Sequence, residues 1–209
     1  MSARLLVVGF LALAAGIAAA ADAALAISVQ GRVTRLGEAS LGAIEALVRL
    51  REGDRLALEP RSRLRLVYFD NGRQETWSGP GRLEVTTREG RPDGLAAAEI
   101  RSLSMAAARQ IARTPDAGDP RPARTRAVPT PDALGRLDEA YRSLRASRAD
   151  ADDLSPEIYL LSGLFELREF DRVERAMADL QQERRGNPEA GLLVALYRKA
   201  VRNARESRK

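Results

Sequence analysis

Residues 51–73, with the sequence REGDRLALEPRSRLRLVYFDNGR, decide the fold that we expect for this chain. Within this stretch Leu64, Leu66 and Tyr68 alternate with Arg63 and Arg65. Alternation with a period of two is typical of a strand that has one face on a hydrophobic core and the other face in water. The stretch therefore predicts a β-rich domain built around a strand between residues 61 and 69.

Glycine-containing turns lie on both sides of this strand. Gly53 and Asp54 form a tight turn before it, and Asn71 and Gly72 reverse the chain after it. Asn-Gly adopts the two positive φ angles of a type I′ hairpin turn at the least cost, so we expect that turn type here. Gly79, in a Gly-Pro-Gly sequence, marks the following turn.

Further short strands are expected before and after the hairpin. The segment 27–36 is rich in β-branched residues and predicts a first strand, residues 47–50 predict a second, and Leu56 and Leu58 belong to a third. The strand after the hairpin should cover 73–78 and pair back on its neighbour, and alternating apolar residues predict another around Leu83. Five or six strands at this spacing indicate a small antiparallel sandwich or open barrel between residues 27 and 94.

The order of these turns and strands resembles the FecR-type domain over about residues 29–88. The resemblance implies a β-rich periplasmic domain, and it suggests a link to sigma-factor signalling, as in the founding FecR system. It rests on four motifs: Gly31-x-Val33, Gly53-Asp-Arg-Leu56, the segment from Arg63 to Gly72, and Gly79-Pro-Gly-Arg-Leu-Glu-Val85.

Residues 1–26 have the composition of a secretory signal peptide. Arg4 precedes an apolar run from residue 5 to residue 21, and small residues follow it, including the late site Ala24-Leu25-Ala26. We expect cleavage there and a mature chain that begins between residues 21 and 27 in the periplasm. A retained membrane anchor is the alternative, because the run approaches the length of about 18 residues that can span a bilayer.

The second half of the chain has the composition of a helical protein. Apolar residues at helical spacing predict a helix at 95–113, and the proline-rich segment 114–131 should be a linker. Beyond it, residues 132–209 predict an α-hairpin stack, in which 159–188 resembles a degenerate tetratricopeptide repeat. The expected fold class is therefore α+β, with a β-domain followed by a helical region.

The residue types in the chain exclude most catalytic arrangements. Histidine and cysteine are absent, and lysine occurs only at positions 199 and 209, so Ser-His-Asp, Cys-His and His or Cys zinc sites cannot form. The acidic residues at 150–153, with Glu157, lack the spacing of a calcium loop. The net charge of +5 comes from interspersed charges rather than from a basic face. We expect no enzyme, no cofactor, no metal site and no nucleic-acid partner.

These features predict a non-catalytic cell-envelope protein that acts in protein recognition or assembly. The apolar helix residues Leu160, Leu164, Phe170 and Tyr197 are the candidates for binding a protein partner. A glycan-associated module is the alternative, in which Trp77 would stack on a sugar ring. Regulation of envelope signalling is a further alternative, although only a few residues precede the apolar run.

Overall fold

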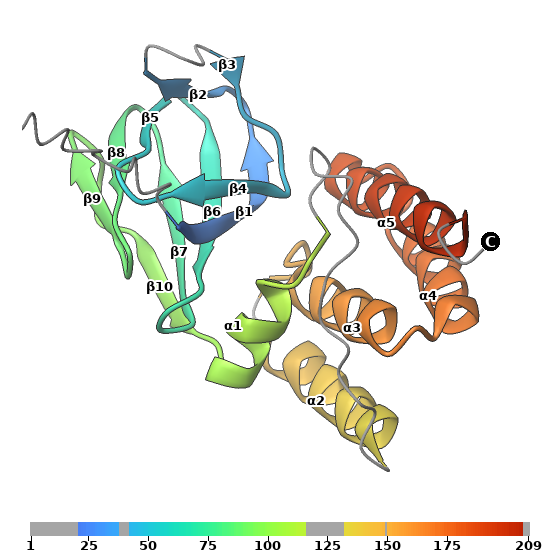
Figure 1. Ribbon diagram of the computed structural model, residues 1–209. Coiled ribbons are helices and arrows are strands. Elements are labelled where there is room, and N and C mark those ends of the chain that lie inside the picture. The colour runs from blue at the N-terminus through green and yellow to red at the C-terminus, as the bar shows by residue number, and fades with distance from the viewer. Residues whose placement is uncertain (1–20, 38–41, 116–131, 149, 207–209) are drawn as a thin grey trace, which may run out of the picture.

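The computed structural model describes residues 21–37, 42–115, 132–148 and 150–206. These residues form two five-stranded antiparallel sheets, followed by five helices that gather on one side of the sheets (Figure 1). The α+β class with a C-terminal helical stack is confirmed. Residues 1–20 of the predicted signal peptide and residues 116–131 of the predicted linker lie outside the described residues.

Each sheet contains strands that are distant in the sequence. Sheet A has the order β10-β7-β6-β1-β4, with bounds Glu99–Ser102, Arg73–Ser78, Arg63–Tyr68, Asp22–Gln30 and Val48–Arg51. Sheet B has the order β3-β2-β5-β8-β9, with bounds Gly42–Ala43, Val33–Leu36, Arg55–Leu58, Gly81–Val85 and Gly90–Asp93. The turn at Gly53 and Asp54 links β4 of sheet A to β5 of sheet B, and thus joins the two sheets.

The predicted single strand at 27–36 is wrong, because the segment is divided between the sheets. β1 begins at Asp22, five residues before the expected edge of the β-domain, and β2 belongs to sheet B. Gly31, with a φ of 72°, turns the chain from one sheet to the other. A Cβ at this glycine would lie 2.9 Å from the Cα of Ser62, so the close approach also requires glycine.

The predicted helix at 95–113 is correct only in its second half. Residues 99–102 form β10, which pairs with β7, and the helix α1 is confined to Met105–Ile111. Ser104 separates the two elements, because its Oγ accepts a hydrogen bond of 3.1 Å from the backbone N–H of Ala107 and caps α1.

The hairpin between β6 and β7 is confirmed, but its turn is not type I′. Residues 69–72 connect the strands, and in this turn only Gly72 has a positive φ, of 68°. The side chain of Asn71 stabilises the reversal instead: its Oδ1 accepts from the N–H of Arg73 at 3.0 Å, and its Nδ2 donates to the carbonyl of Arg88 at 2.9 Å.

Gly72→Val should destabilise the protein strongly. Valine at positive φ costs about 1–3 kcal/mol in backbone strain, and its Cβ would lie 2.5 Å from the carbonyl oxygen of Leu103. Gly53→Val is the matched control, because Gly53 also has a positive φ, of 86°, but faces open space. Thermal unfolding should show a larger loss for Gly72→Val than for Gly53→Val. Equal losses would show that the contact with Leu103 is unimportant.

The helices are neighbours in sequence order, so the stack is built from α-hairpins (Figure 1). α3 is the central helix of the stack and contacts each of the others. The bounds of the four helices after α1 are Ala133–Ser147 for α2, Ser155–Glu166 for α3, Phe170–Glu183 for α4 and Pro188–Glu206 for α5.

The hydrophobic residues form two layers, one on each face of sheet A. Leu64, Leu66 and Tyr68 of β6 fill the space between the sheets. Val67, on the opposite face, packs with the apolar residues of the helices. The expectation that this second face lies in water is wrong, because the helices cover it. The outer face of sheet A and the helices therefore share one hydrophobic core, which is separate from the core between the two sheets.

Candidate functional site

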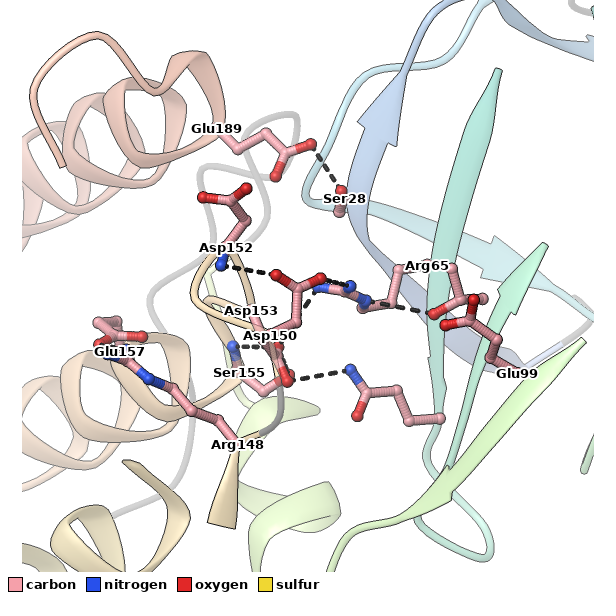
Figure 2. A network of polar contacts seen from close by, with 12 residues as sticks. Ser28, Arg65, Glu99, Arg148, Asp150, Asp152, Asp153, Ser155, Glu157 and Glu189 are labelled. Carbon is pink, nitrogen blue, oxygen red and sulfur yellow. Dashed lines mark hydrogen bonds and ion pairs between the residues drawn. The ribbon is translucent and has the colours of Figure 1, made fainter. Parts of the chain in front are cut away.

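Arg65 of β6 connects the sandwich to the helical region (Figure 2). Its side chain is 8% exposed and points from sheet A toward the loop that precedes α3. The guanidinium bonds Asp150 directly, lies 3.9 Å from an oxygen of Asp153, and donates through Nε to Thr76 at 3.3 Å. Moving the loop away would leave the buried charge of the arginine without its acidic partners, which is unfavourable. The arginine therefore fixes the position of the loop.

Asp153 attaches the start of α3 to the same sheet. Its Oδ1 accepts from the N–H and the hydroxyl of Ser155, at 3.0 and 2.6 Å, and its Oδ2 accepts from Gln74 of β7 at 3.4 Å. The acidic side chains of the loop at 150–153 thus bind Arg65, Gln74 and the first residue of α3. The described parts of the chain contain no group of three or more acidic side chains placed to hold a metal ion.

Glu189 makes a second attachment, from the first turn of α5 to β1. Its Oε1 accepts from the hydroxyl of Ser28 at 2.7 Å and from the N–H of Val29 at 3.0 Å. Val29 is paired with Leu64 of β6 on one side, but the pairing of β1 with β4 on the other side ends at Ala26. The carboxylate therefore satisfies a backbone donor that β4 does not reach.

Two carboxyl groups near this junction have pKa values shifted in opposite directions. Burial raises the pKa of Glu157 above its usual value, against the opposing effect of Arg145 and Arg148, each 3.7 Å away. The backbone N–H of Asp152 and the guanidinium of Arg65 hold the pKa of Asp150 below its usual value. The charged form of Asp150 is therefore stabilised by folding.

Asp150→Asn should make the protein less sensitive to acid. A carboxyl group with a lowered pKa in the folded state contributes stability above its unfolded pKa, near 4, and loses that contribution as the pH falls through the lower folded value. We expect the substitution to cost about 1 kcal/mol at pH 7 and to flatten the fall in melting temperature between pH 5 and pH 3. Asp152→Asn is the control, because it keeps the backbone N–H that Asp150 accepts. Parallel pH profiles for the Asp150 variant and the unmodified protein would contradict the assignment.

Glu75 joins the two sheets, as Arg65 and Glu189 join the sandwich to the helices. It is fully buried, and its carboxylate accepts from Arg73 at 2.5 Å, from the indole of Trp77 at 2.9 Å and from the backbone N–H of Gly90 at 3.0 Å. The last bond joins β7 of sheet A to β9 of sheet B. Burial and the nearby Glu75 raise the pKa of Tyr68 far above its usual value.

Trp77 belongs to the core between the sheets. It is 4% exposed, and its indole N–H is bonded to Glu75. The interpretation of this ring as a platform for a sugar is wrong for the folded protein, because no face of the ring is open to a ligand. Gly53, Gly72 and Gly79 lie in the turns where they were expected.

The four predicted partner-binding residues do not form an exposed surface. Leu164, Phe170 and Tyr197 are buried, and Leu160 is half-buried. They lie inside the helical stack because α3 is surrounded by the other helices. The exposed large apolar residues of the described chain are Ile100 of β10, Met105 of α1 and Leu192 of α5.

A groove of about 600 Å³ lies between β4 and α5. β4 contributes Arg49 and Arg51, and α5 contributes Leu192, Leu196 and Lys199. Arg49 is held firmly: it bonds Asp22 at 3.2 Å and the carbonyls of Ala112 and Thr114 at 2.7 and 2.8 Å. The groove thus combines an exposed leucine with fixed charges, and it exists only because α5 is attached to the sandwich.

Comparisons of the chain with models of protein families, with curated proteins and with solved structures found no match. Within the described ranges, no helix has the length and apolar character needed to cross a bilayer.

The sequence does not reveal the charged residues that join the layers. Arg65 was expected in water because it alternates with leucines, and Glu189 is an acidic residue in a first helical turn, where exposed acids are common. Glu75 lies between polar neighbours in its strand. The one signal in the sequence is that Glu75 lies two residues before Trp77, so the alternation of the strand places it on the same face as that large apolar side chain.

Proposed function

We propose that this protein is a non-catalytic component of the cell envelope that recognises or assembles with another protein. The observation that carries the proposal is the groove between β4 and α5, since both halves of the molecule contribute to it. Leu192, 38% exposed, offers an apolar contact among charges of both signs. Apolar anchors surrounded by charged residues are typical of protein-binding surfaces.

Two further features support recognition rather than chemistry. Catalytic dyads and triads based on histidine or cysteine cannot form, because the sequence contains neither residue. The buried charged side chains, such as Arg65 and Glu189, form hydrogen bonds that join the β-sandwich to the helical region. The resemblance to FecR-type domains and the leader-like N-terminal segment favour a location in the periplasm. The partner would then be another envelope protein. Regulation of envelope signalling, which the resemblance also suggests, is a further alternative.

Leu192→Asp should abolish binding of the partner without unfolding the protein. We expect at least a tenfold loss of affinity, because an apolar anchor at an interface is replaced by a charge. Met105→Asp is the matched control, since Met105 has the same exposed fraction and lies on α1, outside the groove. A photo-crosslinker placed at position 192 would identify the partner from envelope extract, and the affinity of the purified pair would then be measured for both variants.

An equal loss of affinity in both variants, or no loss in either, would show that the groove is not the binding surface. Sedimentation with cell-wall sacculi tests the alternative. If the protein sediments with sacculi and captures no protein through position 192, glycan association replaces protein recognition.

A further inference from the structure

The strand β10 is the open edge of sheet A on the side away from β4. All four of its residues are exposed, and Ile100, at 51%, is the most exposed large apolar residue of the described chain. β7 pairs with one side of β10, and no described strand pairs with the other (Figure 1). Short edge strands of this kind offer unpaired backbone groups to an incoming strand.

The pairing with β7 determines which backbone groups are free. The N–H of Leu103 donates to the carbonyl of Gly72 at 2.8 Å. In an antiparallel pair the bonded residues alternate, so Arg101 and Glu99 also direct their backbone groups toward β7. The N–H and C=O of Ile100 consequently point outward, to the open edge.

The sequence around Ile100 is complementary to itself in an antiparallel arrangement. If a second β10 pairs with the first about a two-fold axis at Ile100, the two Ile100 residues exchange both backbone hydrogen bonds. Glu99 of each copy then lies opposite Arg101 of the other, on the same face of the sheet. Opposite charges directly across a strand pair are stabilising.

We propose that β10 binds the β10 strand of a second copy of this chain and joins two A sheets into one continuous sheet. The side chain of Glu99 is 70% exposed and lies 3.1 Å from Arg63 of its own chain. The contact is isologous, so it closes as a dimer and does not propagate into a fibre. It is independent of the groove between β4 and α5 and of the proposed function.

The pairing of two four-residue strands is a small interface. Interfaces that bury less than about 1,200 Å² are typically weak and transient. We therefore expect a concentration-dependent equilibrium between monomer and dimer rather than a permanent dimer.

Reversal of the two charges tests the register. Glu99→Arg alone and Arg101→Glu alone each place like charges opposite one another at two symmetric positions, and each should weaken the dimer about tenfold. The double variant Glu99→Arg with Arg101→Glu restores opposite charges and should recover dimerisation. Sedimentation equilibrium of protein expressed from the full sequence, at low ionic strength, measures these dissociation constants.

Two controls separate the dimer contact from effects within one chain. Arg63→Gln removes the ion pair between Arg63 and Glu99 but leaves the proposed pairing intact, so the dissociation constant should not change. Ile100→Pro removes an outward N–H together with a half-exposed side chain, and edge strands tolerate proline where the missing N–H faces solvent, so it should abolish the dimer with little change in melting temperature. A monomer at all concentrations, or a double variant no better than the single variants, would overturn the proposal.

Discussion

A chain shortened to begin at Ile27 should fail to fold, whereas a chain that begins at Ala21 should fold. The difference lies in the first half of β1, which is an inner strand of sheet A and pairs with β4 on one side and with β6 on the other. The shortened chain loses the ladder hydrogen bonds to both neighbours and the buried side chains of residues 23–26, of which Leu25 is only 1% exposed.

The expected loss approaches the stability of a typical domain, because the leucine and the ladder hydrogen bonds to two neighbouring strands are lost together. Burial of one leucine accounts for about 2–5 kcal/mol, and a whole domain is stable by about 5–15 kcal/mol. Circular dichroism and thermal denaturation of the two chains measure the difference. Leu25→Ala in the longer chain is the control, and it should lower the melting temperature without abolishing the transition. A cooperative transition in the chain that begins at Ile27 would contradict the role of β1.

The start of β1 at Asp22 also limits where a leader can be removed. Cleavage after Ala26, at the late Ala-Leu-Ala site, would divide β1, whereas cleavage before Asp22 would leave it whole. We therefore expect the mature N-terminus at the early end of the predicted range of 21–27. N-terminal sequencing of the protein isolated from cells that express the full sequence locates its first residue.

Deletion of residues 132–209 should leave a β-sandwich that aggregates. The helices cover the outer face of sheet A, so their removal exposes Leu25, Ile27 and Val67 to water. It also removes Asp150 and Asp153, the partners of the buried Arg65. An exposed apolar sheet face of this kind promotes association, and loss of the acidic partners leaves the arginine uncompensated.

Binding of a hydrophobic dye and the cooperativity of thermal unfolding measure the effect. We expect strong dye binding and loss of the native transition in the truncated protein. Ile27→Thr together with Val67→Thr in the truncated chain should reduce dye binding, because these substitutions make the exposed face more polar. If the truncated protein melts cooperatively at the temperature of the intact protein, the sandwich is an independent domain, as the proline-rich segment suggests.

Local sequence patterns predicted many of the individual elements. The strand at 73–78, the hairpin before it and the α-hairpin stack in the last part of the chain are present in the structure. These features depend on neighbouring residues only: alternation, turn residues and helix-capping residues act within a few positions. The helix expected at 95–113 is wrong in its first half, because the sequence there suits a helix but pairing with β7 makes residues 99–102 a strand.

By itself the sequence determined the α+β class, the positions of the turns and the absence of histidine or cysteine chemistry. Only the tertiary structure decided which surfaces are buried. Arg65 and Val67 alternate with core leucines as solvent-facing residues would, yet the helices cover them. The same packing buries the predicted partner-binding residues Phe170 and Tyr197. The physical reason is that periodicity assigns residues to a face of a strand or helix, whereas burial depends on which distant segment packs against that face.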